Sequence, residues 1–179
     1  MTTQENRAAT PDRIAAGHVV TGRERSLAIQ RWLLAAADDE QKAREQWQRE
    51  GVAVLKCGES FEAVRVPLVI VENAAGDARR IMLAAYLYEA LLGGPVFING
   101  ASNFVYCLVA PGTAKNWRAP DTYCLTGDIY LGMPALSAPG DAASCWLIEP
   151  DGPGEVCLPD AVKQMVDFGR YRAAMRAGA

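Results

Sequence analysis

Apolar and polar residues alternate at the spacing of a helix in the first part of the chain. Residues 1–20 are different, since they mix polar and small residues without periodicity, and we expect a loose arm there. Thr21 and Glu24 have the spacing of a capping box, which satisfies free backbone N–H groups at the start of a helix. Gly51 is a typical helix terminator, so the pattern predicts one long helix from Thr21 to about Glu50.

Short apolar runs at residues 52–55 and 61–66 have the length and composition of strands. Residues 68–73 are ambiguous, because Val-Ile-Val favours a strand whereas the preceding Pro67 favours the first turn of a helix. Residues 77–92 form the clearest helical pattern. The apolar residues that recur along it at a spacing of three or four, and that we expect to face the core, are Ile81, Ala84, Ala85, Tyr88, Leu91 and Leu92.

The second half of the chain has the pattern of an antiparallel meander followed by a helix that begins near Pro159. The expected strands lie at residues 95–98, 104–109, 123–125, 129–131 and 145–148. The first two of these strands predict one hairpin, and the next two predict another. The whole order predicts a single α+β domain over residues 21–179, with a mainly antiparallel sheet of hairpins flanked by a long N-terminal, a central and a C-terminal helix.

Composition and charge narrow the functional classes. Half of the residues are apolar, 22% are charged, and the formal net charge is −3. A mildly acidic chain is poorly suited to gripping a phosphate backbone, so nucleic acid is a possible but disfavoured partner. The N-terminus lacks the apolar core of a secretory signal, and no run of about 18 apolar residues could cross a membrane. We therefore expect a cytoplasmic protein that does not associate with membranes.

Five scattered cysteines and a single histidine, His18, give little basis for a metal centre. No C-x-x-C pair is present, so we expect reduced thiols and predict no zinc site, no other metal ligands and no cofactor. A cysteine-dependent enzyme that uses Cys57, with His18 as its base, or Cys124 is one alternative. Buried, inert thiols are the more common role of such residues.

Four acidic residues could bind a divalent cation if the fold brings them together. Glu59 and Glu62 lie three apart near one strand, and Asp121 and Asp128 could approach them across the second hairpin. The sequence does not decide whether they converge, and acids beside glycines are commonly turn residues. Neither a P-loop nor a dinucleotide-binding glycine motif is present.

Aromatic residues next to cations form the candidate ligand-binding group. Such faces can stack nucleobases, although tyrosines on strands are commonly half-buried sheet residues. The group consists of Lys115, Trp117, Arg118, Tyr106, Tyr123 and Tyr130. Trp32 and Trp47, in the predicted long helix, are candidate partner-binding residues because that helix could present a docking or dimer face.

Three segments, within about residues 52–165, carry a resemblance to a known family. They are residues 63–67, residues 94–96 with 105–111, and residues 125–134 followed by Trp146. These segments resemble the bifunctional DNA primase/polymerase (prim-pol) family, which has an archaeo-eukaryotic primase-like fold. The family has a D-x-D metal-binding pair where this chain reads Val64-Arg65-Val66, and a histidine where it has Val105 or Tyr106. The resemblance therefore implies a primase-like fold without nucleotidyl transfer, and no catalytic residue is carried over.

These observations lead to one preferred hypothesis and two alternatives. The preferred one is a catalytically silent, primase-like domain that acts as a protein-binding or regulatory module and binds a protein partner or a second copy of itself. The first alternative is a module that binds nucleotides or single-stranded nucleic acid. The second is the small cysteine-dependent enzyme.

Overall fold

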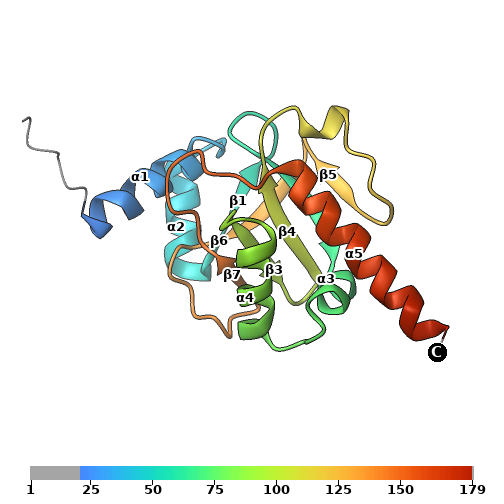
Figure 1. The fold of residues 1–179 in the computed structure, drawn as a ribbon. Helices are drawn as coiled ribbons and strands as arrows, with labels where there is room; N and C mark the ends of the chain where they lie inside the picture. Colours follow the sequence, from blue (N-terminus) through green and yellow to red (C-terminus); the bar gives the residue numbers. More distant parts are fainter. Residues whose placement is uncertain (1–20, 179) are drawn as a thin grey trace, which may run out of the picture.

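The computed structural model of the protein describes residues 21–178, so the predicted arm and His18 lie outside the described residues. The predicted α+β fold is confirmed (Figure 1). The helices are α1 Gly22–Leu34, α2 Glu40–Glu50, α3 Leu68–Ala75, α4 Arg80–Ala90, α5 Pro159–Ala177 and the short 3₁₀ helix η1 Thr113–Lys115. The strands are β1 Val52–Lys56, β2 Glu62–Pro67, β3 Val96–Asn99, β4 Phe104–Val109, β5 Tyr123–Leu125, β6 Tyr130–Pro134 and β7 Ser144–Ile148.

The predicted long N-terminal helix is wrong, because two helices occupy that segment. The capping box at Thr21 is present and starts α1, and the left-handed Gly51 ends α2 as predicted. Between them the Asp39 side chain accepts a hydrogen bond from the backbone N–H of Lys42 and caps α2. Aspartate is a strong N-cap because its oxygen satisfies an N–H that the helix itself leaves free. Asp39 and Glu40, in the middle of the segment predicted as one helix, therefore start a second helix.

Seven strands form two antiparallel sheets in the described part of the chain. The five-stranded sheet has the order β5-β2-β4-β3-β7, and β1 pairs with β6 in a separate two-stranded sheet. The hairpin predicted from residues 95–98 and 104–109 is the pair β3–β4. The second predicted hairpin is wrong, since β5 pairs with β2 and β6 pairs with β1. The chain crosses between the sheets at Gly127, which has a left-handed φ of 67°.

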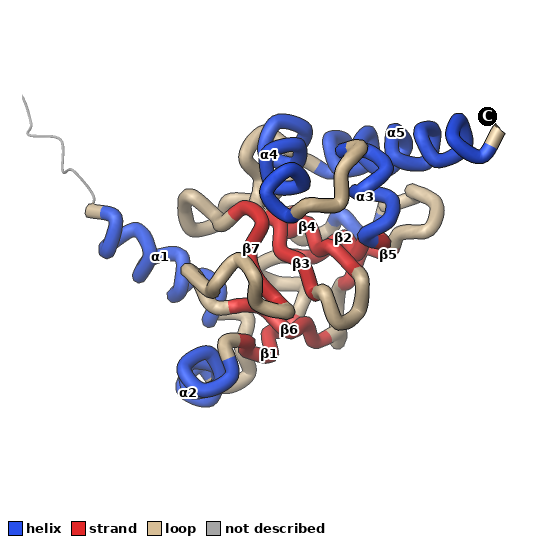
Figure 2. Tube along the Cα trace, turned by 90° about the horizontal axis from the view of Figure 1, so that it is seen from below, coloured by secondary structure: helices blue, strands red, loops and turns tan. Residues whose placement is uncertain are grey.

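Both faces of the five-stranded sheet are covered, which gives the fold three layers. Figure 2 shows α3, α4 and α5 on one side of the strands, with β1, β6 and α2 on the other. Alternate residues of β2 serve the two faces: Val64 and Val66 join the core under the three helices, whereas Ala63 joins the core under β1 and β6. The period-two alternation of a strand produces this division.

The ambiguous segment after Pro67 is the helix α3, which packs closely against α5. Gly169 makes this contact possible, because a Cβ at that position would lie 2.2 Å from the carbonyl oxygen of Ile70. The C-terminal end of α5 continues past α3 and extends from the body of the molecule (Figures 1 and 2). Over residues 21–178, no helix is both long enough and apolar enough to cross a bilayer.

The predicted core face of α4 is largely wrong. Leu91 is buried as predicted, but Leu83 and Leu87 supply the rest of the contact with the core, and Ile81 and Tyr88 point outward. Between Ile81 and Leu92 the only charged residue is Glu89. Periodicity cannot select one face of a helix that is apolar almost all round.

Candidate functional site

The six predicted ligand-binding residues do not form one site. Tyr106 is buried, with its ring stacked on Phe97 at a centroid distance of 4.9 Å. Tyr130 lies on the smaller sheet, where its hydroxyl donates to Asp38 at 2.6 Å. Tyr123 is exposed on β5, at the edge of the larger sheet. Tyr130 is therefore apart from the other two, and Tyr106 and Tyr123 are separated by β2 within the larger sheet.

Trp117 and Arg118 do come together, beside a hollow of about 270 Å³ between η1 and the start of α5. The residues that line it are Thr113, Asn116, Trp117, Arg118, Pro159, Asp160 and Lys163. The indole N–H of Trp117 donates to the Thr122 hydroxyl at 2.9 Å, and the Arg118 guanidinium donates to the carbonyl oxygens of Trp117 and Lys115. The Trp117 ring, the cations Arg118 and Lys163 and the carboxylate of Asp160 thus line this small hollow, whereas Lys115 is not part of the lining.

Arg65 was not among the predicted ligand-binding residues, although its surroundings suit an anion. It lies on β2 between Tyr106 of β4 and Tyr123 of β5. Its guanidinium carbon lies 4.6 Å from the Phe104 ring centroid and 5.2 Å from that of Tyr123. The Nε atom is buried without a hydrogen-bond partner, and no acid of residues 21–178 forms an ion pair with the guanidinium. The sequence signal for this position was the alternation Val64-Arg65-Val66, because neighbouring residues of a strand point to opposite faces and Arg65 therefore faces away from both valines.

The two predicted partner-binding tryptophans contribute to packing within the chain. Trp32 is half-buried, and its ring meets Phe61 edge-on at a centroid distance of 6.2 Å. Trp47, also half-buried, donates its indole N–H to the carbonyl oxygen of Met133 at 2.9 Å. Both rings pack against the core under β1 and β6. A role in binding a partner stays a prediction for both.

The four acids singled out in the sequence do not all converge, although Glu59 and Asp128 line the same hollow of about 310 Å³. Asp128 pairs with Lys56 at 2.9 Å, and Asp121 forms an ion pair with Arg170. Glu59 is exposed, whereas Glu62 is buried with 3% of its surface accessible. Residues 21–178 contain no cluster of three or more His, Cys, Asp or Glu side chains that could hold a metal ion.

Glu62 is the only buried charged side chain within residues 21–178, and its contacts explain its position. Its carboxylate accepts hydrogen bonds from the Thr126 hydroxyl at 2.6 Å and from the backbone N–H of Ala114 at 2.7 Å. Burial raises the pKa of this carboxyl, but these bonds and one from the N–H of Gly112 outweigh burial and hold the pKa below its usual value. Glu62 therefore stays ionised and fastens η1 and β5 to β2.

The two candidate nucleophilic thiols are protonated at neutral pH. Burial, followed by the charge of Glu62, raises the pKa of Cys57 to about 11. The same two causes, with a hydrogen bond to Glu62, raise the pKa of Cys124 to about 12. Because the thiolate is the reactive form, both thiols lie in the wrong electrostatic environment for a nucleophile.

The outer face of α4 is apolar and uncovered. Ile81, Tyr88 and Leu92 have 76%, 58% and 75% of their surfaces exposed. Leu92 also has a left-handed backbone with a φ of 54°. A bulky residue in that conformation is an outlier that costs about 1–2 kcal/mol, since its Cβ crowds the following carbonyl oxygen. The chain thus holds a large apolar side chain in water at a strained position.

A groove of about 810 Å³ separates α4 from α1. Ile29 of α1, Ala84, Tyr88 and Leu92 of the α4 segment, and Leu147 supply apolar parts of its lining. The charged lining residues are Arg25, Glu149, Asp151 and Glu155. Apolar walls with charged residues among them are typical of a surface that receives another protein segment.

Comparisons of the chain with protein-family models, with curated proteins and with solved structures found no match. The resemblance to the prim-pol family therefore stays a prediction from the sequence.

Proposed function

We propose that this domain is a protein-binding module whose docking surface consists of the outer face of α4 and the groove between α4 and α1. We call this set of residues the α4 surface; its central members are Ile81, Ala84, Tyr88 and Leu92. The observation that carries the proposal is that α4 is apolar on both sides, while the core covers only one of them. A helix that is apolar all round belongs between two packed layers, and the second layer is a partner.

The α4 surface has the energetic features of a binding region. Fully burying a Leu, Ile or aromatic side chain stabilises a complex by about 1.5–3 kcal/mol, so the three most exposed residues could supply much of the affinity of a modest interface. Tyr88 is an especially suitable anchor, because tyrosine offers a large contact area with few rotatable bonds. Ala84, next to it, leaves room for close approach of a partner helix.

Charge narrows the class of partner. Glu149 and Glu155 stand in the groove, and neither forms an ion pair with a cation among the described residues. The matching partner is a protein segment that carries an apolar helical face together with Lys or Arg side chains. Such a segment would bury the apolar residues and neutralise the two carboxylates.

Catalytic silence is part of the proposal and is supported by chemistry rather than by the fold. The primase-like origin rests on the sequence resemblance alone, and Arg65 stands on the strand where that family has its acidic pair. Cys57 and Cys124 are protonated thiols at neutral pH. The α4 surface, which no packing among residues 21–178 explains, consists of apolar side chains and not of reactive groups.

The test compares the wild-type chain with two matched full-length variants, each expressed in the cells that naturally make the protein and purified from them with its bound proteins. Tyr88→Glu places a charge on the α4 surface, and Val69→Glu places the same charge on α3, where Val69 is equally exposed at 58%. We expect a protein that copurifies with the wild type and with Val69→Glu to be lost with Tyr88→Glu. That protein, once purified, should bind the wild type directly and bind Tyr88→Glu at least about tenfold more weakly. Equal binding to all three chains would refute the proposal.

Nucleotide or single-strand binding is the second candidate, favoured by the position of Arg65 between two aromatic rings and without a carboxylate. A guanidinium next to exposed Tyr123 could contact a phosphate while a base stacks on the ring. ATP or a short oligothymidylate should then raise the melting temperature, because a ligand that binds only the folded state stabilises it. The rise should disappear in Arg65→Gln and persist in Arg49→Gln, which changes an exposed arginine on α2. No rise at millimolar ligand would exclude this candidate.

A further inference from the structure

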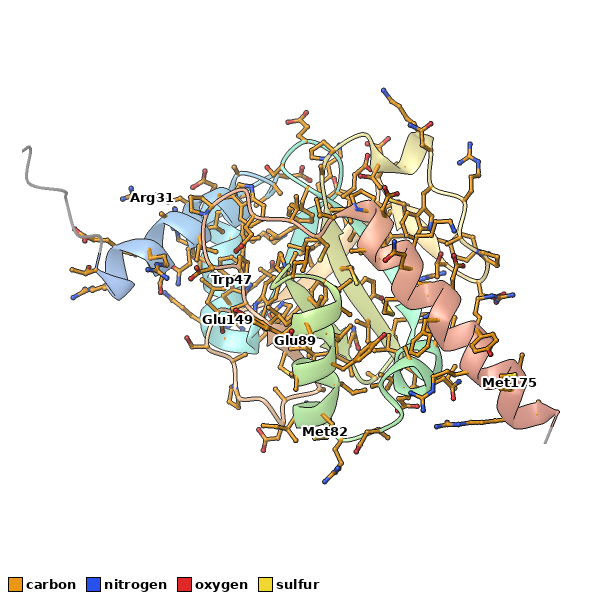
Figure 3. The ribbon with its side chains drawn as sticks, viewed as in Figure 1. Arg31, Trp47, Met82, Glu89, Glu149 and Met175 are labelled. Atoms are coloured by element: carbon orange, nitrogen blue, oxygen red, sulfur yellow. The ribbon has the colours of Figure 1, made fainter. Side chains whose placement is uncertain are left out.

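The projecting end of α5 has the chemistry that the α4 surface requires of a partner. Phe168, Tyr171 and Met175 recur at helical spacing along it and are all exposed. From Phe168 to Met175 the helix rises about 10 Å, which makes a short apolar stripe. Met175 is labelled in Figure 3 where this end of α5 extends from the body. We call these residues, with Arg172 and Arg176, the α5 tail.

The α5 tail carries positive charge that no acid among residues 21–178 neutralises through an ion pair. Arg170 pairs with Asp121, which cancels that charge. Arg172 donates to the carbonyl oxygen of Ala74 at 3.0 Å, and Arg176 donates to the side-chain oxygen of Asn73 at 3.1 Å. Both of these acceptors are neutral, so two positive charges remain on the tail.

The groove between α1 and α4 carries an excess of negative charge. Arg25 and Asp151 pair at 2.5 Å and cancel each other. Glu149 accepts from the backbone N–H of Ser137, and Glu155 accepts from that of Asp151. Because these donors are neutral, two negative charges remain in the groove. The tail and the groove therefore match in charge as well as in apolar character.

We propose, building on the protein-binding function above, that the partner is a second copy of this chain, whose α5 tail docks in the groove between α1 and α4. The groove and the tail of one chain cannot meet, since Glu149 beside the groove and Met175 near the end of α5 lie on opposite sides of the molecule (Figure 3). In Figure 2 as well, α1 and the end of α5 extend in opposite directions. The contact is therefore made between copies.

This contact joins two different surfaces, which determines the kind of assembly. A head-to-tail contact leaves one free groove and one free tail on every pair of copies, so further copies add until a ring closes or a filament grows. We expect the average mass in sedimentation equilibrium to rise beyond that of a dimer as the protein concentration increases. High salt should lower the mass, because the Debye length falls to about 3 Å at 1 M and screens the charges that remain exposed at the contact.

The decisive experiment mixes two full-chain variants. Tyr88→Ser damages the groove and leaves the tail intact, whereas Tyr171→Ser with Met175→Ser damages the tail and leaves the groove intact. All three side chains are exposed, so both variants should fold. Each variant alone should be monomeric, and an equimolar mixture should form a 1:1 heterodimer that grows no further, because only one intact groove meets one intact tail.

Other outcomes overturn the inference in distinguishable ways. A mixture that stays monomeric, or a single variant that still assembles, excludes the tail-in-groove contact. A third measurement attaches a cross-linker at position 88. If the cross-link forms within one chain, independent of protein concentration, then residues 1–20 or another part of the same chain occupies the groove, and the second copy is excluded. If the wild type is monomeric at all concentrations while a different protein is still lost with Tyr88→Glu, the second copy is wrong and the protein-binding function stands.

Discussion

Glu62 and the α4 surface are opposite departures from the usual distribution of residues. Glu62 is a charged group inside the protein, and the α4 surface is a large apolar area outside it. A buried polar group and an exposed apolar patch are the two informative exceptions in a folded domain, because an isolated exposed leucine is ordinary. The two differ in whether contacts among the described residues explain why the side chains lie where they do.

Contacts within the chain fully explain the burial of Glu62. Its oxygens accept hydrogen bonds from Thr126 and Ala114, and these bonds hold both residues against Glu62 of β2, from which they are 64 and 52 residues away in sequence. At the α4 surface Tyr88 and Leu92 keep 58% and 75% of their surfaces exposed among the described residues. The difference indicates that Glu62 serves stability, whereas the α4 surface serves a contact with another molecule.

The largest expected effect is at Glu62. Glu62→Gln keeps the shape of the side chain but replaces one carboxylate oxygen with an NH₂ group. That group faces the donors of Ala114 or Thr126, so a buried donor loses its acceptor. We expect a loss of about 3 kcal/mol in the free energy of unfolding, since each buried unsatisfied group costs about 1–3 kcal/mol. Chemical denaturation measures this, with Glu59→Gln on the exposed neighbour as the matched control. A loss no greater than that of the control would mean that the buried carboxylate is not a structural anchor.

A smaller effect of the same group should appear in the pH dependence of stability. The folded-state pKa of Glu62 is lowered, so its contribution is fully present above the unfolded-state pKa and is lost as the pH falls through the folded-state pKa. From pH 7 down into the acid range, the wild type should therefore lose more unfolding free energy than Glu62→Gln does. Parallel pH profiles for the two chains would contradict this.

The sequence-based predictions were accurate for features that depend on neighbouring residues and inaccurate for features that depend on tertiary packing. Signals that act within a few residues were sufficient for the capping box at Thr21, the terminator Gly51 and the hairpin β3–β4. The partner of β5 was not predictable, because Tyr123–Leu125 pairs with β2 across more than 50 residues of chain, and alternation says nothing about which strand lies alongside. The candidate site was missed for a related reason. Helical spacing identified Ile81 and Tyr88 as one apolar face, but only the packed structure shows that the core covers the other face.

An effect of opposite sign is expected at the edge of the α4 surface. Leu92→Gly removes the steric cost of the left-handed backbone, and we expect the monomer to gain about 1 kcal/mol in unfolding free energy. Asn103→Gly is the matched control, because Asn103 has a similar φ of 57° and asparagine tolerates that conformation. Thermal or chemical unfolding should show a clear gain for Leu92→Gly and a smaller change for Asn103→Gly. Binding at the α4 surface should weaken in Leu92→Gly alone, which would show that the strained leucine is kept for the contact.

The smallest effect on stability is expected at Tyr88, the residue on which the binding function most depends. Tyr88→Ser removes a ring that is mostly in water, so the unfolding free energy should change by no more than about 0.5 kcal/mol. Tyr123→Ser, at an equally exposed tyrosine on β5, should behave the same in denaturation but leave association unchanged. Denaturation and sedimentation of the two variants separate the roles. A large loss of stability at Tyr88 would mean that the monomer does use this ring, and the contrast between a group kept for folding and a surface kept for binding would no longer hold.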